Sequence, residues 1–145
     1  MLLKNKNCYI NLIILAILLL TGCASNYSRL TPEQKENTKK NAAIKVTCRE
    51  GSDCSEKWSR AINWVVQVSQ WKIQTQTDNL IQTFGSVNQS MFSAFTVNKT
   101  AISPGIYEIK IEAGCSNMIG CDQEPAIWKA LFNLYVTGNI KTPTG

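Results

Sequence analysis

The sequence predicts an α+β domain: an antiparallel sheet of about five strands with two helices on one face. Three observations predict it. Short segments alternate apolar with polar residues, two longer segments repeat apolar residues at helical spacing, and these elements run in the order strand, helix, four strands, helix. Strands joined by turns pair antiparallel, and helices with one apolar stripe each bury those stripes against the same sheet.

The first strand and the first helix are expected on either side of residue 50. The segment AIKVT, residues 43–47, has the composition of a strand. Helical spacing follows over residues 54–70, and Asp53 with Glu56 three residues later resembles the capping box that begins a helix. The apolar face of this helix consists of Trp58, Ala61, Ile62, Val65 and Val68.

Three strands are expected next. Apolar and polar residues alternate over 71–76, and a hairpin turn at 77–79 leads into a strand over 80–84. A loop is expected over 85–90, and another strand over 91–97.

The clearest strand covers residues 107–113, after a turn at 103–105. The closing helix begins near Pro125, which suits the first turn of a helix. Residues 138–145 are expected to fray. The apolar stripe of this helix consists of Ile127, Ala130, Leu131, Leu134 and Tyr135. The solvated face of the sheet carries Lys72, Gln74, Gln76, Glu108, Lys110 and Glu112.

The N-terminal segment has the pattern of a secretory signal. Residues 1–7 contain Lys4 and Lys6 but no acidic residue, and residues 8–20 are apolar except for Asn11. A membrane-spanning helix needs about 20 apolar residues, and this run is shorter. We therefore expect it to be removed rather than to remain as a membrane span.

The tetrapeptide Leu20-Thr21-Gly22-Cys23 resembles the lipobox of bacterial lipoproteins. That resemblance implies a diacylglycerol on the Cys23 thiol, cleavage before Cys23, and usually a further acyl chain such as palmitate on the new amino group. Two or three acyl chains hold a protein on a bilayer durably. An ordinary secretory signal or a hydrophobic anchor is the alternative.

The residue after the cysteine is Ala24 rather than aspartate, which in the lipoprotein family implies the outer membrane, with the domain on its periplasmic face. The inner membrane and the cell surface are the alternatives. The expected organisation is a lipoprotein signal peptide over 1–22, a lipidated flexible tether over 23–41, one domain over 42–140 and a frayed tail over 141–145. Within the tether, residues 31–34 could open one short helix.

The remaining cysteines repeat one design, in which five residues separate the members of a pair, a strand precedes the pair and a helix follows it. An even number of cysteines in an exported chain predicts disulfides. Of the three possible connectivities we expect the local one, and a four-thiolate zinc site fits the spacing poorly. The expected bonds are Cys48 with Cys54 and Cys115 with Cys121.

The element order resembles the helix-grip or TBP-like class, which includes domains of an outer-membrane assembly lipoprotein. This resemblance concerns the order of elements alone and carries no function.

The composition excludes several kinds of chemistry. The sequence has no histidine, which removes the commonest general base and metal ligand, so no catalytic residue, metal or cofactor is expected. Asp53 and Asp122 lie beside the two cysteine pairs and could approach each other as a carboxylate pair, although helix capping explains both. A net charge of +5, dispersed along the chain, does not indicate nucleic acid.

Trp64 and Phe132 stand at the borders of the two helix stripes and are the candidates for partner contact, with packing over the sheet edge as the alternative. The expected function is that of a non-enzymatic envelope lipoprotein, held to the membrane by acyl chains on Cys23 and docking another envelope protein as a scaffold or accessory component. The alternatives are a periplasmic enzyme, a small-ligand carrier or an inhibitor of a foreign hydrolase.

Overall fold

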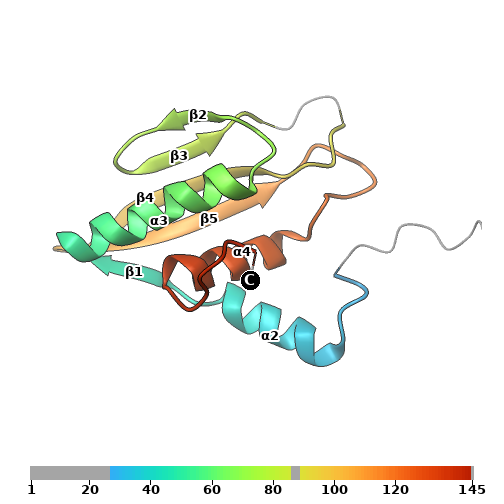
Figure 1. Ribbon diagram of the computed structural model, residues 1–145, viewed down its shortest axis with the longest axis horizontal. Coiled ribbons are helices and arrows are strands. Elements are labelled where there is room, and N and C mark those ends of the chain that lie inside the picture. Colours follow the sequence, from blue (N-terminus) through green and yellow to red (C-terminus); the bar gives the residue numbers. More distant parts are fainter. Residues whose placement is uncertain (1–26, 86–88, 145) are drawn as a thin grey trace, which may run out of the picture.

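The computed structural model describes residues 27–85 and 89–144. It contains an antiparallel sheet in the order β1-β5-β4-β3-β2 (Figure 1), which confirms the predicted α+β class and the number of strands. The strands are β1 (Val46–Arg49), β2 (Ile73–Gln76), β3 (Leu80–Thr83), β4 (Ala94–Ser103) and β5 (Ile106–Gly114), and the helices are α2 (Pro32–Ala42), α3 (Ser52–Val68) and α4 (Pro125–Val136).

One face of the sheet forms the core. Alternate residues of the strands lie directly opposite one another, as Val46 does with Ile109 and Val97 with Ile111, and all four side chains are buried. Helices α3 and α4 cover this face and contact each other, and the buried residues of α3 follow the predicted stripe. The two-residue period of the strands thus determines which face is apolar.

Helix α2 differs from the expected tether. It forms because Thr31 and Gln34 make a capping box, in which the Thr31 hydroxyl accepts from the Gln34 amide and the Gln34 side chain accepts from the Thr31 amide. Its C-terminal end is fixed to α4 by the buried Asn133, whose side-chain amide donates to the backbone oxygens of Asn41, Ala42 and Ile44 at 3.0, 3.2 and 3.0 Å. The folded domain therefore includes residues that we expected to be flexible.

Helix α4 buries a wider surface than the predicted stripe. Phe132, Asn133 and Val136 are buried together with Ala130, because α4 packs against α3 and the sheet on one side and against α2 on another. The segment after α4, expected to fray, returns over the core, where the backbone oxygen of Pro143 accepts the indole N–H of Trp64 at 3.0 Å.

Strand β2 contains a bulge that the alternating pattern did not predict. Ile73 pairs with Thr83, but Thr75 pairs with Gln82 and Gln76 with Ile81, so one additional residue is inserted on β2. The bulge brings Gln76 into register with Ile81, and the Gln76 side chain is exposed, as expected for the solvated face. Lys110 and Glu112 do lie on the solvated face and form an exposed ion pair of 3.4 Å.

Within residues 27–85 and 89–144, no helix combines the length and the apolar character that crossing a membrane requires.

Candidate functional site

Two disulfides join the cysteines that the repeated spacing pairs, and each closes a corner between a strand and the helix that follows it. Cys48 is bonded to Cys54 and Cys115 to Cys121, which confirms the local connectivity. The first bond lies in the core, where both cysteines are buried. The second closes a loop on the surface, and the residues inside that loop are largely exposed.

At the first corner, Asp53 has a role other than helix capping. Helix α3 has Gly51 as its N-cap and no side-chain cap, so the predicted capping box is wrong. The Asp53 carboxylate instead accepts the backbone N–H of Arg49 at 2.8 Å and pairs with Lys57 at 2.9 Å, while Lys57 donates to the backbone oxygen of Thr47 at 2.8 Å. These contacts occupy two outward groups of β1, and an edge strand whose groups are occupied resists pairing with another chain.

The Arg49 backbone N–H and the Lys57 ammonium hold the pKa of Asp53 below its usual range. A carboxyl group whose pKa is lower in the folded than in the unfolded state adds stability above the unfolded pKa and loses it as pH falls through the folded one. We therefore expect the advantage of the parent over Asp53→Asn to disappear below about pH 4. Thermal unfolding of both proteins as a function of pH measures it, with Asp78→Asn, in an exposed turn, as the matched control. Parallel profiles for parent and Asp53→Asn would contradict this role.

At the second corner, Asp122 fixes the disulfide loop to the segment that leads into β4. One of its carboxylate oxygens accepts the Ser93 backbone N–H at 3.1 Å and the Ser93 hydroxyl at 2.7 Å, and Ser93 in turn accepts the indole N–H of Trp128 at 3.1 Å. The backbone N–H of Asp122 donates to the Met91 oxygen at 2.7 Å. Asp122 thus orders the loop rather than capping α4, whose N-cap is Glu124.

The two aspartates do not form a carboxylate pair. Asp53 is hydrogen-bonded to Arg49, which pairs with Ile106 at the start of β5. Asp122 is hydrogen-bonded to Ser93, and the next residue, Ala94, pairs with Gly114 at the end of β5. A nine-residue strand separates these positions by roughly 27 Å. The expectation that they might approach each other is wrong.

Trp64 and Phe132 are fully buried, so the prediction that they contact a partner is wrong. Their rings pack edge to face with centroids 5.4 Å apart, and Trp64 also packs on Phe95 at 5.2 Å and on Trp128 at 5.9 Å. A border position on a helix stripe becomes central here because α4 and the chain after it cover α3 from the side.

Five of the eight large apolar residues that are exposed in the described chain lie instead in the segments at one end of the sheet, where β3 and β5 end and β4 begins. Figure 1 shows these strand ends side by side. Met118 and Ile119, inside the second disulfide loop, are 95% and 87% exposed. Hydrogen bonds hold the neighbouring segments together: Trp71 donates its indole N–H to the Phe92 oxygen at 3.2 Å, and the Lys72 oxygen accepts the Phe84 N–H at 3.0 Å. We call this surface the apolar end; it consists of Phe84, Met91, Phe92, Met118 and Ile119.

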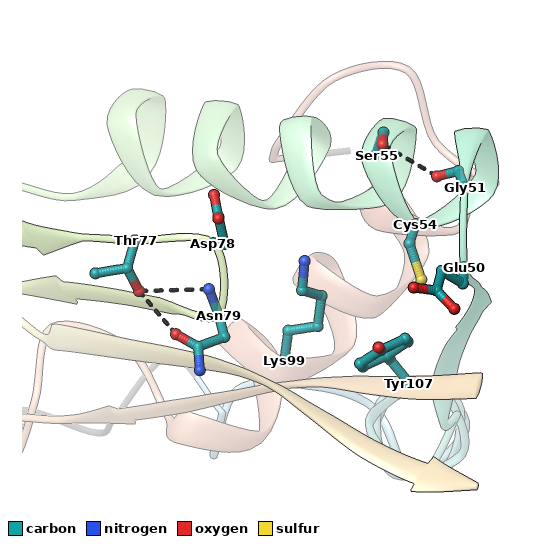
Figure 2. A pocket seen from close by; sticks show the side chains of 9 residues that line it. All are labelled: Glu50, Gly51, Cys54, Ser55, Thr77, Asp78, Asn79, Lys99 and Tyr107. Atoms are coloured by element: carbon teal, nitrogen blue, oxygen red, sulfur yellow. Dashed lines mark hydrogen bonds between the residues drawn. The ribbon is translucent and has the colours of Figure 1, made fainter. Parts of the chain in front are cut away.

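A cleft of about 580 Å³ lies between the first turns of α3 and the turn that joins β2 to β3 (Figure 2). Lys99 extends into it, with its ammonium 5.0 Å from the ring centre of Trp58 and 6.0 Å from that of Tyr107. Within residues 27–85 and 89–144, Lys99 forms no ion pair. The other lining residues are polar or small: Glu50, Gly51, Cys54, Ser55, Thr77, Asp78 and Asn79.

In the part of the chain that the structure describes, no group of three or more Asp, Glu or Cys side chains lies close enough together to hold a metal ion. Cys23 lies outside the described residues, so its acylation stays a prediction. No family model, no curated protein and no solved structure matches the chain.

The apolar end was not predicted from the sequence, although the composition of the loop over 115–121 indicates it. The loop CSNMIGC contains two large apolar residues between cysteines, where nothing else in the loop can cover them. Exposed large apolar groups held by a covalent bond are typical of contact surfaces. Asn133 and Lys99 carried no such signal, because a lone polar residue in a helix or strand usually faces solvent.

Proposed function

We propose that this protein is a bacterial envelope lipoprotein, anchored by acyl chains on Cys23 at the periplasmic face of the outer membrane, whose domain acts by contact rather than by catalysis. The lipobox supports the anchor. The observation that carries the second part is the apolar end, where two adjacent side chains in a disulfide-closed loop are 95% and 87% exposed. Soluble proteins seldom expose such groups together unless another surface covers them.

The ordering of this loop supports a contact role. A disulfide closes it, Asp122 hydrogen-bonds it to Ser93, and the Asn117 side chain donates to the backbone oxygen of Gln89. Because these bonds restrict the loop before any contact is made, binding loses little conformational entropy.

The cleft around Lys99 favours a second candidate, a carrier of a small ligand. An ammonium beside two aromatic rings, with no carboxylate partner in the described chain, can accept an anionic group of a ligand. The cleft is wide enough for a small molecule, but Glu50 and Asp78 at its rim oppose an anion.

A pair of variants separates these candidates. Met118→Ser with Ile119→Ser is expected to retain the thermal stability of the parent, since neither side chain is buried, yet to behave in cells like a deletion of the gene. The matched control is Val66→Ser with Ile102→Ser, two apolar residues that are 60% and 53% exposed elsewhere on the surface. If the first pair behaves like the parent and Lys99→Ala behaves like the deletion, the cleft is the functional site and the contact proposal fails.

A further inference from the structure

We propose that the apolar end lies on the periplasmic surface of the same bilayer that carries the acyl chains, so that the domain is anchored at two points. This inference rests on the proposed acylation of Cys23 and specifies what covers the apolar end. The bilayer is the partner, and the contact consists of large apolar side chains entering the region between headgroups and acyl chains.

The first argument is the length of the tether. Helix α2 and the turn before it shorten the unstructured distance that the sequence suggested: Tyr27 is packed on α2, with the Lys35 ammonium 5.9 Å from its ring centre and donating to the Ser28 oxygen. Only three residues lie between Cys23 and Tyr27. Even fully extended, they place Tyr27 within about 14 Å of Cys23. The start of α2 is therefore held near the headgroups.

The second argument is the direction in which the domain then faces. In Figure 1 the blue segment that precedes α2 and the loops that follow β3 and β5 lie toward the same end of the long axis. The turn between β4 and β5 lies at the opposite end. A bilayer next to the start of α2 at this end also faces the apolar end. The Lys99 cleft lies beside the β2–β3 turn, which is toward the opposite end in Figure 1.

The third argument is charge. The described segments that form the apolar end, residues 84–85, 89–92 and 115–121, contain no Asp, Glu, Lys or Arg. Charged groups are costly below the headgroups, and their absence from every one of these segments suits entry into the interface. Trp71, whose indole N–H donates to the Phe92 oxygen beside this surface, adds an aromatic residue of the kind enriched at membrane interfaces.

Quenching by brominated lipids tests this placement on the full lipidated protein. The variants Ile119→Trp and Ile102→Trp each replace an exposed isoleucine, one in the apolar end and one near the opposite end of the β4–β5 hairpin. Each is purified from membranes and reconstituted in phosphatidylethanolamine and phosphatidylglycerol vesicles, with and without bromine on the acyl chains. The parent protein provides the emission of the native tryptophans, and unfolding curves verify that both variants are folded.

We expect bromine to reduce the added emission of Ile119→Trp and to leave that of Ile102→Trp unchanged. Equal quenching of both variants would show a domain without a fixed orientation and would overturn the inference. Quenching of neither, on a sample whose N-terminal peptide carries the lipid, would also overturn it and would leave a protein as the partner of the apolar end. A sample without lipid on Cys23 overturns the proposed function, and this inference with it.

Discussion

Replacing Trp64 with alanine is expected to lower the free energy of unfolding by about 3 to 5 kcal/mol. Trp64 is fully buried and packs edge to face on Phe95, Trp128 and Phe132, with centroids 5.2, 5.9 and 5.4 Å away. Its removal leaves a cavity at the junction of α3, α4 and the sheet and releases the Pro143 oxygen that accepts its indole N–H. Since domains are typically stable by about 5 to 15 kcal/mol, this loss would remove a large part of the stability of the fold.

Urea unfolding of purified protein measures the loss, and two variants show its origin. Trp64→Phe keeps an aromatic ring in the core, so it should lose less stability than Trp64→Ala. It should still be less stable than the parent, because phenylalanine cannot donate to the Pro143 oxygen. Val66→Ala, on the exposed side of the same helix, should lose at most about 0.5 kcal/mol. If Trp64→Ala unfolded at the same urea concentration as Val66→Ala, Trp64 would not be part of the core.

Replacing Asn133 with aspartate is expected to cost about 3 kcal/mol at neutral pH. The two side chains have nearly the same shape, but the carboxylate has no N–H to donate and would face the backbone oxygens of Asn41, Ala42 and Ile44. Burial beside these oxygens should raise the pKa of the introduced carboxyl, since both features disfavour its charged form. The penalty should therefore become smaller as pH falls and the carboxyl gains a proton that it can donate.

Limited digestion with trypsin separates this local effect from global unfolding. Once Asn133 no longer holds α2, cleavage after Lys35, Lys39 and Lys40 should become faster than in the parent under conditions where α3 and the sheet remain folded. Asn139→Asp is the matched control, because Asn139 is exposed and its side-chain amide donates to the Thr137 hydroxyl rather than to α2. Equal cleavage of Asn133→Asp and Asn139→Asp would contradict the role of Asn133 in docking α2.

Local patterns predicted the elements whose environment is local. The alternation over 107–113 identified β5, and the turn at 103–105 identified its connection to β4. The equal spacing of the cysteines identified both disulfides, because a bond across five residues needs only a strand, a tight turn and the next element.

Predictions that depended on tertiary neighbours were less accurate. The spacing of apolar residues placed Trp64 and Phe132 at the borders of their helix stripes. That spacing does not report the positions of α2 and of the chain after α4, which add to the core. Asp53 had the sequence of a cap but lies beside β1, whose free edge groups offered a competing hydrogen bond. A bulge in β2 shifted the pairing register with β3, and the alternation of apolar and polar residues does not reveal a bulge.

In our proposal the apolar end orients the molecule relative to its anchor, and this connects the fold with the proposed function. Helix α2 shortens the distance to Cys23, the second disulfide and Asp122 order the loop that displays Met118 and Ile119, and the cleft around Lys99 remains open on another side. The proposed orientation depends on the attachment of lipid at Cys23.

The mass of the N-terminal peptide of the mature protein, isolated from bacterial membranes, tests that claim most directly. We expect a peptide that begins at Cys23 and carries a diacylglycerol on its thiol, and the Cys23→Ser variant should accumulate as an unprocessed precursor because serine cannot form the thioether. A free, unmodified N-terminus at any residue would contradict the proposed anchor.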